Sequence, residues 1–167
     1  YGVAETLFKL DDAMEPIPWL AQGYEALNTK TWRIEIKENI YFQNGVEMTA
    51  KKVKESLDRV IELNSRAKST LKIKNIEVDG KYLIFNMEEE NPTLINDLCD
   101  PFAAIIDVNG TETPDSNPVG TGPFIVEKFT TISSSYLTRN NNYWDGDVKL
   151  SSLKIIPISD SDTLAMA

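Results

Sequence analysis

The sequence predicts an α/β fold with mixed sheets, on three observations. Residues 31–37 alternate strictly between apolar and polar side chains, as in a half-buried strand. From Thr49 onward the apolar residues recur with a helical period as far as residue 63. Asp79 and Gly80 then form a hairpin turn between two strand-like segments, residues 71–79 and 81–87. Helical and strand patterns therefore alternate along the chain.

Composition excludes several classes of function. The 167 residues are 41% hydrophobic and 26% charged, which is typical of a soluble globular protein with one core or two small lobes. A net charge of -9 argues against a nucleic-acid partner, which needs a basic surface. The sequence has no histidine and one cysteine, Cys99, so it can form no internal disulfide, Ser-His-Asp triad or histidine-bearing zinc site.

The sequence of the first part of the chain predicts short extended segments before the strand at 31–37. Residues 4–10 indicate a helical turn followed by a short strand, and residues 16–18 are extended because two of them are prolines. Residues 19–21 form an apolar turn. We expect Trp19 to fill the core there rather than to stack on a ligand.

The central helix and the strand after it have clear signals. Thr49 is a natural N-cap, and Met48 can form a hydrophobic staple with Val53 across it. The strand at 71–79 changes the parity of its apolar residues along its length. We expect a bulge near Asn75 to reconcile the two halves.

The segment after residue 90 predicts a short helix, a buried strand and a linker. Asn91 caps the helix, whose apolar stripe is formed by Leu94, Ile95 and Leu98. Residues 102–108 follow as a buried strand. Residues 109–118 are polar and contain Gly and Pro, which makes them the clearest linker.

The last third predicts three strands, at 124–129, 134–139 and 153–158. Ser159 and Asp162 then form a capping box for a helix of which the chain contains only about eight residues, short of the usual length. We therefore expect the chain to be a piece of a longer protein.

Residues 117–129, with the sequence NPVGTGPFIVEKF, form a shaped turn that leads into a strand. Gly120 and Gly122 allow backbone angles that are closed to other residues, and Pro123 fixes its own φ angle. Alone, this pattern also fits a tight loop in many folds. Its place among other motifs makes it informative.

Two further motifs accompany this turn. Residues 41–50 read YFQNGVEMTA and precede the central helix, and residues 139–146 read RNNNYWDG. In this order and at these intervals, the three motifs resemble those of the solute-binding subunits of bacterial ABC importers for peptides, dipeptides and nickel. The resemblance covers nearly the whole chain.

The resemblance implies a lobe of a two-lobed receptor that closes on its solute. The chain matches the first lobe only, and the second lobe is absent. In that lobe, residues 14–113 would form a smaller α/β subdomain. Residues 1–13 and 114–167 would form a base subdomain, which is incomplete.

The resemblance also implies a function in import, with no catalysis and no cofactor. The solute would be nickel, carried in a small-molecule chelator because the chain has no histidine, or a di- or oligopeptide. Residues 2–10 are more similar to the nickel branch. The partner would be an ABC permease, and the protein would lie outside the cytoplasm, lipid-anchored to the outer face of the cell membrane or periplasmic.

Arg66 is the first candidate for a solute-binding residue, because a guanidinium can grip a carboxylate in a bidentate manner. Its alternative role is that of a solvated charge after a helix. Asp100 stands where some nickel binders place a second arginine, which puts the same ligand in doubt. Tyr1 and Tyr41 are aromatic candidates for the wall of a site, and Trp144 is expected to close the edge of the base sheet.

Other sites and functions are less well supported by the sequence. Oxygen ligands from Asp145, Asp147, Asp160 and Asp162 lack the spacing of a calcium loop, so we expect loop solvation and helix capping instead. Cys99 is expected to be a buried apolar residue. A carboxylate-based hydrolase needs two acidic groups that converge, and spacing alone places no such pair.

A carbohydrate-binding module is a further alternative, with tryptophan rings as stacking platforms. It requires at least two of Trp19, Trp32 and Trp144 to be flat and open to solvent. We expect Trp32 and Trp144 to be buried.

Overall fold

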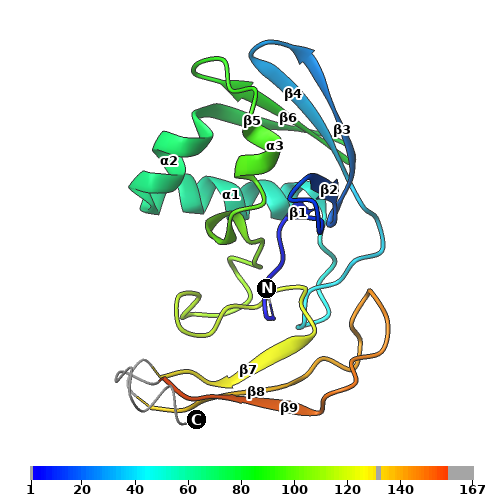
Figure 1. Cartoon of the computed structure of the whole chain (residues 1–167), viewed down its shortest axis with the longest axis vertical. Coiled ribbons are helices and arrows are strands. Elements are labelled where there is room, and N and C mark those ends of the chain that lie inside the picture. Colours follow the sequence, from blue (N-terminus) through cyan, green and yellow to red (C-terminus); the bar gives the residue numbers. More distant parts are fainter. Residues whose placement is uncertain (1, 131–132, 158–167) are drawn as a thin grey trace.

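The computed structural model describes residues 2–130 and 133–157. It has the predicted α/β fold, with a larger body of strands and helices and a separate three-stranded sheet beneath it (Figure 1). The first described residues run between the two parts (Figure 1). All of the strand pairs within the described ranges are antiparallel.

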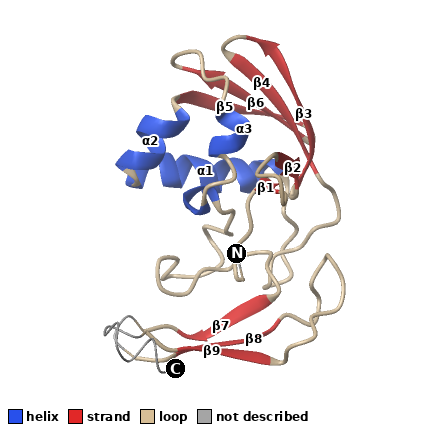
Figure 2. Cartoon of the chain, viewed as in Figure 1, coloured by secondary structure: helices blue, strands red, loops and turns tan. Residues whose placement is uncertain are grey.

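The larger body contains a four-stranded sheet in the order β3-β4-β6-β5. Its strands are β3 (Ala21–Asn28), β4 (Thr31–Ile36), β5 (Ile73–Asp79) and β6 (Tyr82–Met87). The helices lie on one side of this sheet (Figure 2). The predicted bulge in β5 is confirmed, since the register shifts between Ile73 and Asn75. The hairpin loop lies one residue later than predicted, because Asp79 pairs with Tyr82.

Strand β3 was not predicted, and its burial explains why. It lies at the edge of the sheet, and most of its side chains are exposed, including Tyr24 and Leu27. An exposed edge strand needs no alternation of apolar and polar residues, so its sequence carried no periodic signal. Its pairing with β4 is what defines it.

Helix α1 (Ala50–Leu63) begins as predicted, with the Thr49 side chain accepting a hydrogen bond from the backbone N–H of Lys52. Val53 and Leu57 are fully buried beneath it. A second helix, α2 (Ser65–Leu71), occupies the segment between the predicted helix and the predicted strand at 71–79, and includes the first residue of that strand. Asn64 ends α1 and caps α2 through its side chain, so the chain resumes a helix after a single residue.

The predicted helix after Asn91 is present as α3 (Leu94–Asp97), which is only one turn long. The predicted cap is wrong, because Thr93 rather than Asn91 is the N-cap, and the Asn91 side chain instead accepts from the backbone N–H of Thr93 before the helix begins. The buried strand predicted at 102–108 is wrong. The chain instead forms a 3-10 turn, η1 (Pro101–Ala103), because the Asp100 side chain accepts from the backbone N–H of Phe102 and caps that turn. Ile105 then makes one isolated bridge to Glu5.

The lower sheet has the order β7-β8-β9 and contains the three strands predicted for the last third. They are β7 (Phe124–Lys128), β8 (Ser135–Arg139) and β9 (Ser152–Ile155). A small ribbon of β1 (Phe8–Leu10) and β2 (Pro16–Pro18) lies near the larger sheet, with Phe8 fully buried. The helix predicted from Ser159 lies outside the described residues. Among the helices that the structure describes, none has the length and apolarity to cross a membrane.

Candidate functional site

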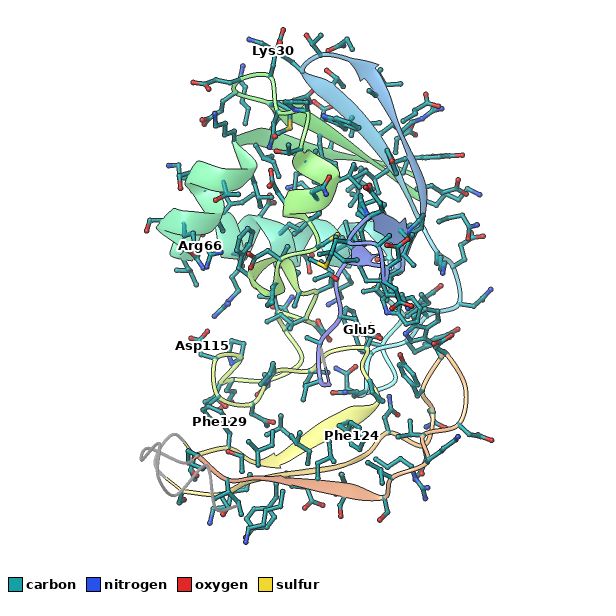
Figure 3. The ribbon with its side chains drawn as sticks, viewed as in Figure 1. Glu5, Lys30, Arg66, Asp115, Phe124 and Phe129 are labelled. Atoms are coloured by element: carbon teal, nitrogen blue, oxygen red, sulfur yellow. The ribbon has the colours of Figure 1, made fainter. Side chains whose placement is uncertain are left out.

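Arg66, the first sequence candidate, lies on α2 and forms an ion pair with Asp100. Its Nη2 atom donates to Asp100 Oδ2 at 2.9 Å, with 74% of the Arg66 side chain and 29% of the Asp100 side chain exposed. The guanidinium carbon also lies 5.6 Å from the centre of the Phe102 ring. Arg66 thus stands at the surface of the helical side of the larger body (Figure 3).

The structure joins two residues that the sequence treated separately. Asp100 is held in place from two sides, because its Oδ1 atom accepts from the backbone N–H of Phe102 while Oδ2 accepts from Arg66. A fixed carboxylate in turn orients the guanidinium. Arg66 keeps donors for a second acceptor, since a guanidinium carries five N–H groups.

A second arginine pair lies on the same side of the molecule and was not predicted. Arg59 on α1 donates to Asp115 in the 109–118 linker at 2.7 Å, with the Arg59 side chain 21% exposed and the Asp115 side chain 86% exposed. Figure 3 shows Asp115 below Arg66. No sequence signal links these two residues, because they are 56 positions apart.

The structure does not place the aromatic candidates, Tyr1 and Tyr41, in contact with Arg66 among the residues that it describes. Tyr41 is 47% exposed and forms an isolated bridge with Glu47. The described residues show no hydrogen bond or ring contact between Tyr41 and Arg66. Tyr1 lies outside the described residues.

The carboxylate of Glu5, which the sequence did not single out, accepts four side-chain hydrogen bonds. Glu5 is 4% exposed. Its Oε1 atom accepts from the Trp19 indole at 2.8 Å and from the Tyr143 hydroxyl at 2.7 Å. Its Oε2 atom accepts from the Thr121 hydroxyl at 2.8 Å and from the Trp144 indole at 2.9 Å. Four donors fill the acceptor capacity of a carboxylate, so Glu5 is a structural anchor rather than a free acid.

This anchor explains why the motifs occur together. Thr121 comes from the glycine-rich turn and Trp144 from the RNNNYWDG motif, and both donate to the same Glu5 side chain near the chain start. Burial and the neighbouring Glu5 carboxylate both raise the pKa of the Tyr143 hydroxyl, which keeps it a donor. The motifs therefore bind the lower sheet to the larger body.

Gly120 and Gly122 allow a close approach of two backbone segments. A Cβ atom on Gly120 would lie 2.2 Å from the carbonyl oxygen of Val3, and one on Gly122 would lie 2.6 Å from that of Gly2. Gly122 donates its N–H to Val3 at 2.9 Å. Side chains at these two positions would push the segments apart. Pro123 follows at the wall of a neighbouring hollow.

That hollow has a volume of about 500 Å³ and lies beside the Glu5 anchor. Its walls include Leu10, Trp19, Pro123 and Tyr143, and Lys9 places its ammonium 3.2 Å from the centre of the Trp19 ring. The polar atoms of Glu5, Trp19 and Tyr143, which line it, are already hydrogen-bonded to one another, which leaves few directed contacts for a solute.

The tryptophans are half-buried, so the expectation that Trp32 and Trp144 are buried is only partly right. Trp144 packs edge-on against Trp19, with the ring centres 5.0 Å apart, at the junction between the two parts of the fold. Trp32 lies on β4 next to the exposed edge strand. Neither arrangement presents a flat, open pair of rings, which argues against a carbohydrate platform.

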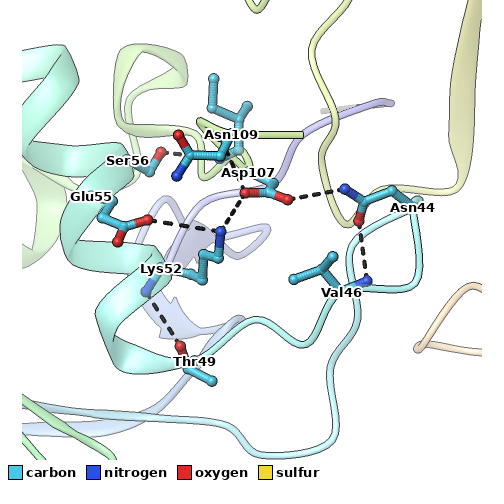
Figure 4. A network of polar contacts seen from close by, with 9 residues as sticks. Asn44, Val46, Thr49, Lys52, Glu55, Ser56, Asp107 and Asn109 are labelled. Atoms are coloured by element: carbon cyan, nitrogen blue, oxygen red, sulfur yellow. Dashed lines mark hydrogen bonds and ion pairs between the residues drawn. The ribbon is translucent and has the colours of Figure 1, made fainter. Parts of the chain in front are cut away.

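A second buried network, also missed by the sequence, centres on Asp107 (Figure 4). Asp107 is 2% exposed, and its carboxylate accepts from Lys52 Nζ at 2.8 Å and from Asn44 Nδ2 at 2.9 Å. It joins α1, the turn at 43–45 and the linker. Burial alone would raise the pKa of Asp107, but the hydrogen bonds from Lys52 and Asn44 outweigh it and hold the pKa below its usual range.

Metal ligands do not gather in the described part of the chain, where no group of three or more acidic or cysteine side chains is placed to hold an ion. Asp160 and Asp162 lie outside the described residues. Cys99 is buried as predicted, and burial raises the pKa of its thiol to about 11.

Comparison with known proteins gives a consistent result. Residues 15–167 match the bacterial extracellular solute-binding proteins, family 5 Middle. The chain is 34% identical over 154 residues to the nickel-binding protein NikA of Staphylococcus aureus, covering 92% of this chain and 31% of that protein. It is 30% identical over 169 residues to the glutathione-binding protein GsiB of Salmonella typhimurium, covering 95% of this chain and 33% of that one.

Solved structures agree with these matches. The crystal structure of a nickel ABC transporter protein from Bacillus halodurans superposes with a TM-score of 0.94 at 38% identity, covering 99% of this chain and 35% of that one. The structure of S. aureus NikA in complex with Ni(L-His)2 also gives a TM-score of 0.94, at 33% identity, and 99% of this chain is covered against 36% of that protein. The chain thus spans about a third of the length of these relatives.

Proposed function

The chain belongs to the bacterial extracellular solute-binding proteins of family 5, and on that premise we propose that it is part of the solute-binding component of an ABC importer. This component captures nickel in a small-molecule chelate outside the membrane and delivers it to the permease, without catalysing a reaction. The likeness to the B. halodurans nickel transporter protein carries this proposal, because its fold and sequence both match over nearly the whole chain.

A di- or oligopeptide solute is the second candidate. The 30% identity to GsiB favours it, since the name of that relative states glutathione as its ligand, and glutathione is a small peptide. Both solutes present carboxylates, so the same guanidinium could hold either. A nickel chelate is ranked first because two relatives of the nickel branch match more closely than the glutathione binder does.

Within this protein we propose that Arg66 contacts the solute. Three observations support it: its side chain is 74% exposed, Asp100 orients it, and the Phe102 ring lies beside its guanidinium. Tyr1 and Tyr41 remain proposed contributors to the wall of the site. Gly120, Gly122 and Trp144 act instead by holding the glycine-rich turn and the RNNNYWDG motif against residues 2–5, and Pro123 belongs to the same turn.

We propose the same division of the chain as the sequence suggested. Residues 14–113 contain the four-stranded sheet and the three helices, which supports a smaller subdomain. Residues 1–13 and 114–167 form the base, with the β7-β8-β9 sheet in its second part. A second lobe outside this chain would complete the solute site. A lipid anchor, holding the protein at the outer face of the cell membrane, belongs to the same proposal.

Isothermal titration calorimetry on the full-length protein tests the function. We expect saturable binding of nickel in the presence of L-histidine and weaker or no binding of a dipeptide such as Ala-Ala. Tight dipeptide binding with no response to the nickel chelate would replace nickel by peptide as the solute. Binding of neither would contradict the proposed function.

A further inference from the structure

The Arg66–Asp100 pair has a geometry that bears on the kind of solute. Asp100 cannot turn away from Arg66 without losing a backbone contact, since its Oδ1 atom accepts from the N–H of Phe102 at 3.1 Å and its Oδ2 atom from Arg66 at 2.9 Å. Both side chains are reachable, at 29% and 74% exposure. A solute that meets Arg66 therefore also meets a fixed negative charge.

The charges of the pair cancel, which changes what Arg66 can attract. A lone guanidinium favours anions of any charge, and more so as their charge rises. Beside Asp100, a second or third carboxylate of a solute would approach a like charge. An N–H group of the solute, in contrast, would find an acceptor there, because a carboxylate has about four acceptor positions and Asp100 uses one for the backbone of Phe102 and one for Arg66.

We infer that Asp100 determines the class of solute, and that the pair selects a carboxylate next to an amine, as in an amino acid or peptide backbone, over a polycarboxylate. The carboxylate contacts the unused edge of Arg66 and the amine donates to Asp100. An amine that coordinates a metal keeps N–H groups, so an amino-acid chelate satisfies the pair as well as a free zwitterion does. This inference rests on the proposed function and names the solute chemistry of the same site.

The neighbouring ion pair provides a matched control. Arg59 and Asp115 are also an arginine and an aspartate at contact distance on the same side of the molecule, but the Asp115 side chain is 86% exposed and lies in the linker. An Asp115→Asn change removes the same charge from that side without touching Arg66. The substitution Asp100→Asn is equally conservative, because an asparagine oxygen can still cap η1.

Calorimetry on the full-length protein, with nickel and L-histidine, nickel and citrate, and Ala-Ala as probes, tests the inference. For the wild type we expect tighter binding of the histidine chelate than of the citrate chelate. In Asp100→Asn, the preference should fall by about ten- to a hundredfold, the range for one hydrogen bond to a charged group. Asp115→Asn should leave the preference unchanged. General damage to the fold would weaken both chelates together and would not invert or flatten their ratio.

Three results overturn the inference. A wild-type preference for citrate is one, an unchanged preference in Asp100→Asn is the second, and an equal change in Asp115→Asn is the third. These leave the proposed function standing, since a solute still binds. If none of the three probes binds to the wild type, the proposed function fails and the inference with it.

Discussion

Replacement of Glu5 by glutamine tests the anchor between the two parts of the fold. The carboxylate accepts four hydrogen bonds, two of them from indole N–H groups that cannot act as acceptors. A glutamine supplies one oxygen and one amide nitrogen. If the nitrogen takes the place of Oε1 it faces the Trp19 donor, and if it takes the place of Oε2 it faces the Trp144 donor. Either way, one buried indole N–H loses its acceptor.

The magnitude follows from these contacts. One buried donor without a partner costs about 1–3 kcal/mol, and two bonds that remain lose their charge-assisted strength, roughly 1 kcal/mol each. The neutral amide offsets part of this loss, because Glu5 has no ion pair among the described residues and its charge is held 4% exposed. We expect a net loss of about 2 kcal/mol in the free energy of unfolding.

Urea unfolding followed by tryptophan fluorescence measures this loss directly, since Trp19 and Trp144 both contact Glu5. The matched control is Glu25→Gln, which removes an acid from an exposed pair with Arg33, at 55% and 41% side-chain exposure. That change should stay within about 0.5 kcal/mol. If Glu5→Gln is no more destabilising than the control, the anchor is not what joins the two parts.

Three further outcomes are expected. Asp107→Asn should reduce the loss of stability in acid. Because the pKa of Asp107 is lowered in the folded protein, its stabilising contribution is present above the usual carboxyl range and is lost as pH falls through the folded-state pKa, below about pH 4. An unchanged acid-unfolding curve would contradict this. Gly120→Ala should lower the free energy of unfolding in urea by roughly 3 kcal/mol, since its Cβ would lie 2.2 Å from a backbone oxygen. Gly23→Ala, whose Cβ would have nothing within 4 Å, should be close to neutral, and equal effects of the two changes would contradict the close approach at Gly120. Cys99 should resist a maleimide at pH 8 until urea is added, because burial raises the pKa of its thiol to about 11, and rapid labelling of the folded protein would show that it is accessible.

The sequence predicted those elements whose burial is periodic. Helix α1, the bulge in β5 and the strands of the lower sheet follow from side-chain alternation and capping that depend on neighbouring residues. Strand β3 was not predicted because the side chains of an exposed edge strand show no such period. Helix α2 was not predicted because Asn64 both ends one helix and caps the next. The 102–108 segment was read as a strand from its apolar residues, although the cap by Asp100 turns the chain there.

The candidate site was only half accessible to sequence reasoning. A guanidinium after a long helix can be noticed from its residue type, and Arg66 was. Its partner is 34 positions away, at the start of η1, which packs against α1. The same holds for Glu5, which was an ordinary acid in the sequence and is joined by residues up to 139 positions distant. Contacts between distant charged residues leave no local pattern.

A crystal structure of the full-length protein with its bound solute tests the central claim most directly. We expect a solute enclosed between this lobe and a second one, with a carboxylate oxygen within about 3 Å of the Arg66 guanidinium. A solute held entirely by other parts of the protein, with Arg66 in contact with Asp100 and solvent alone, would contradict it.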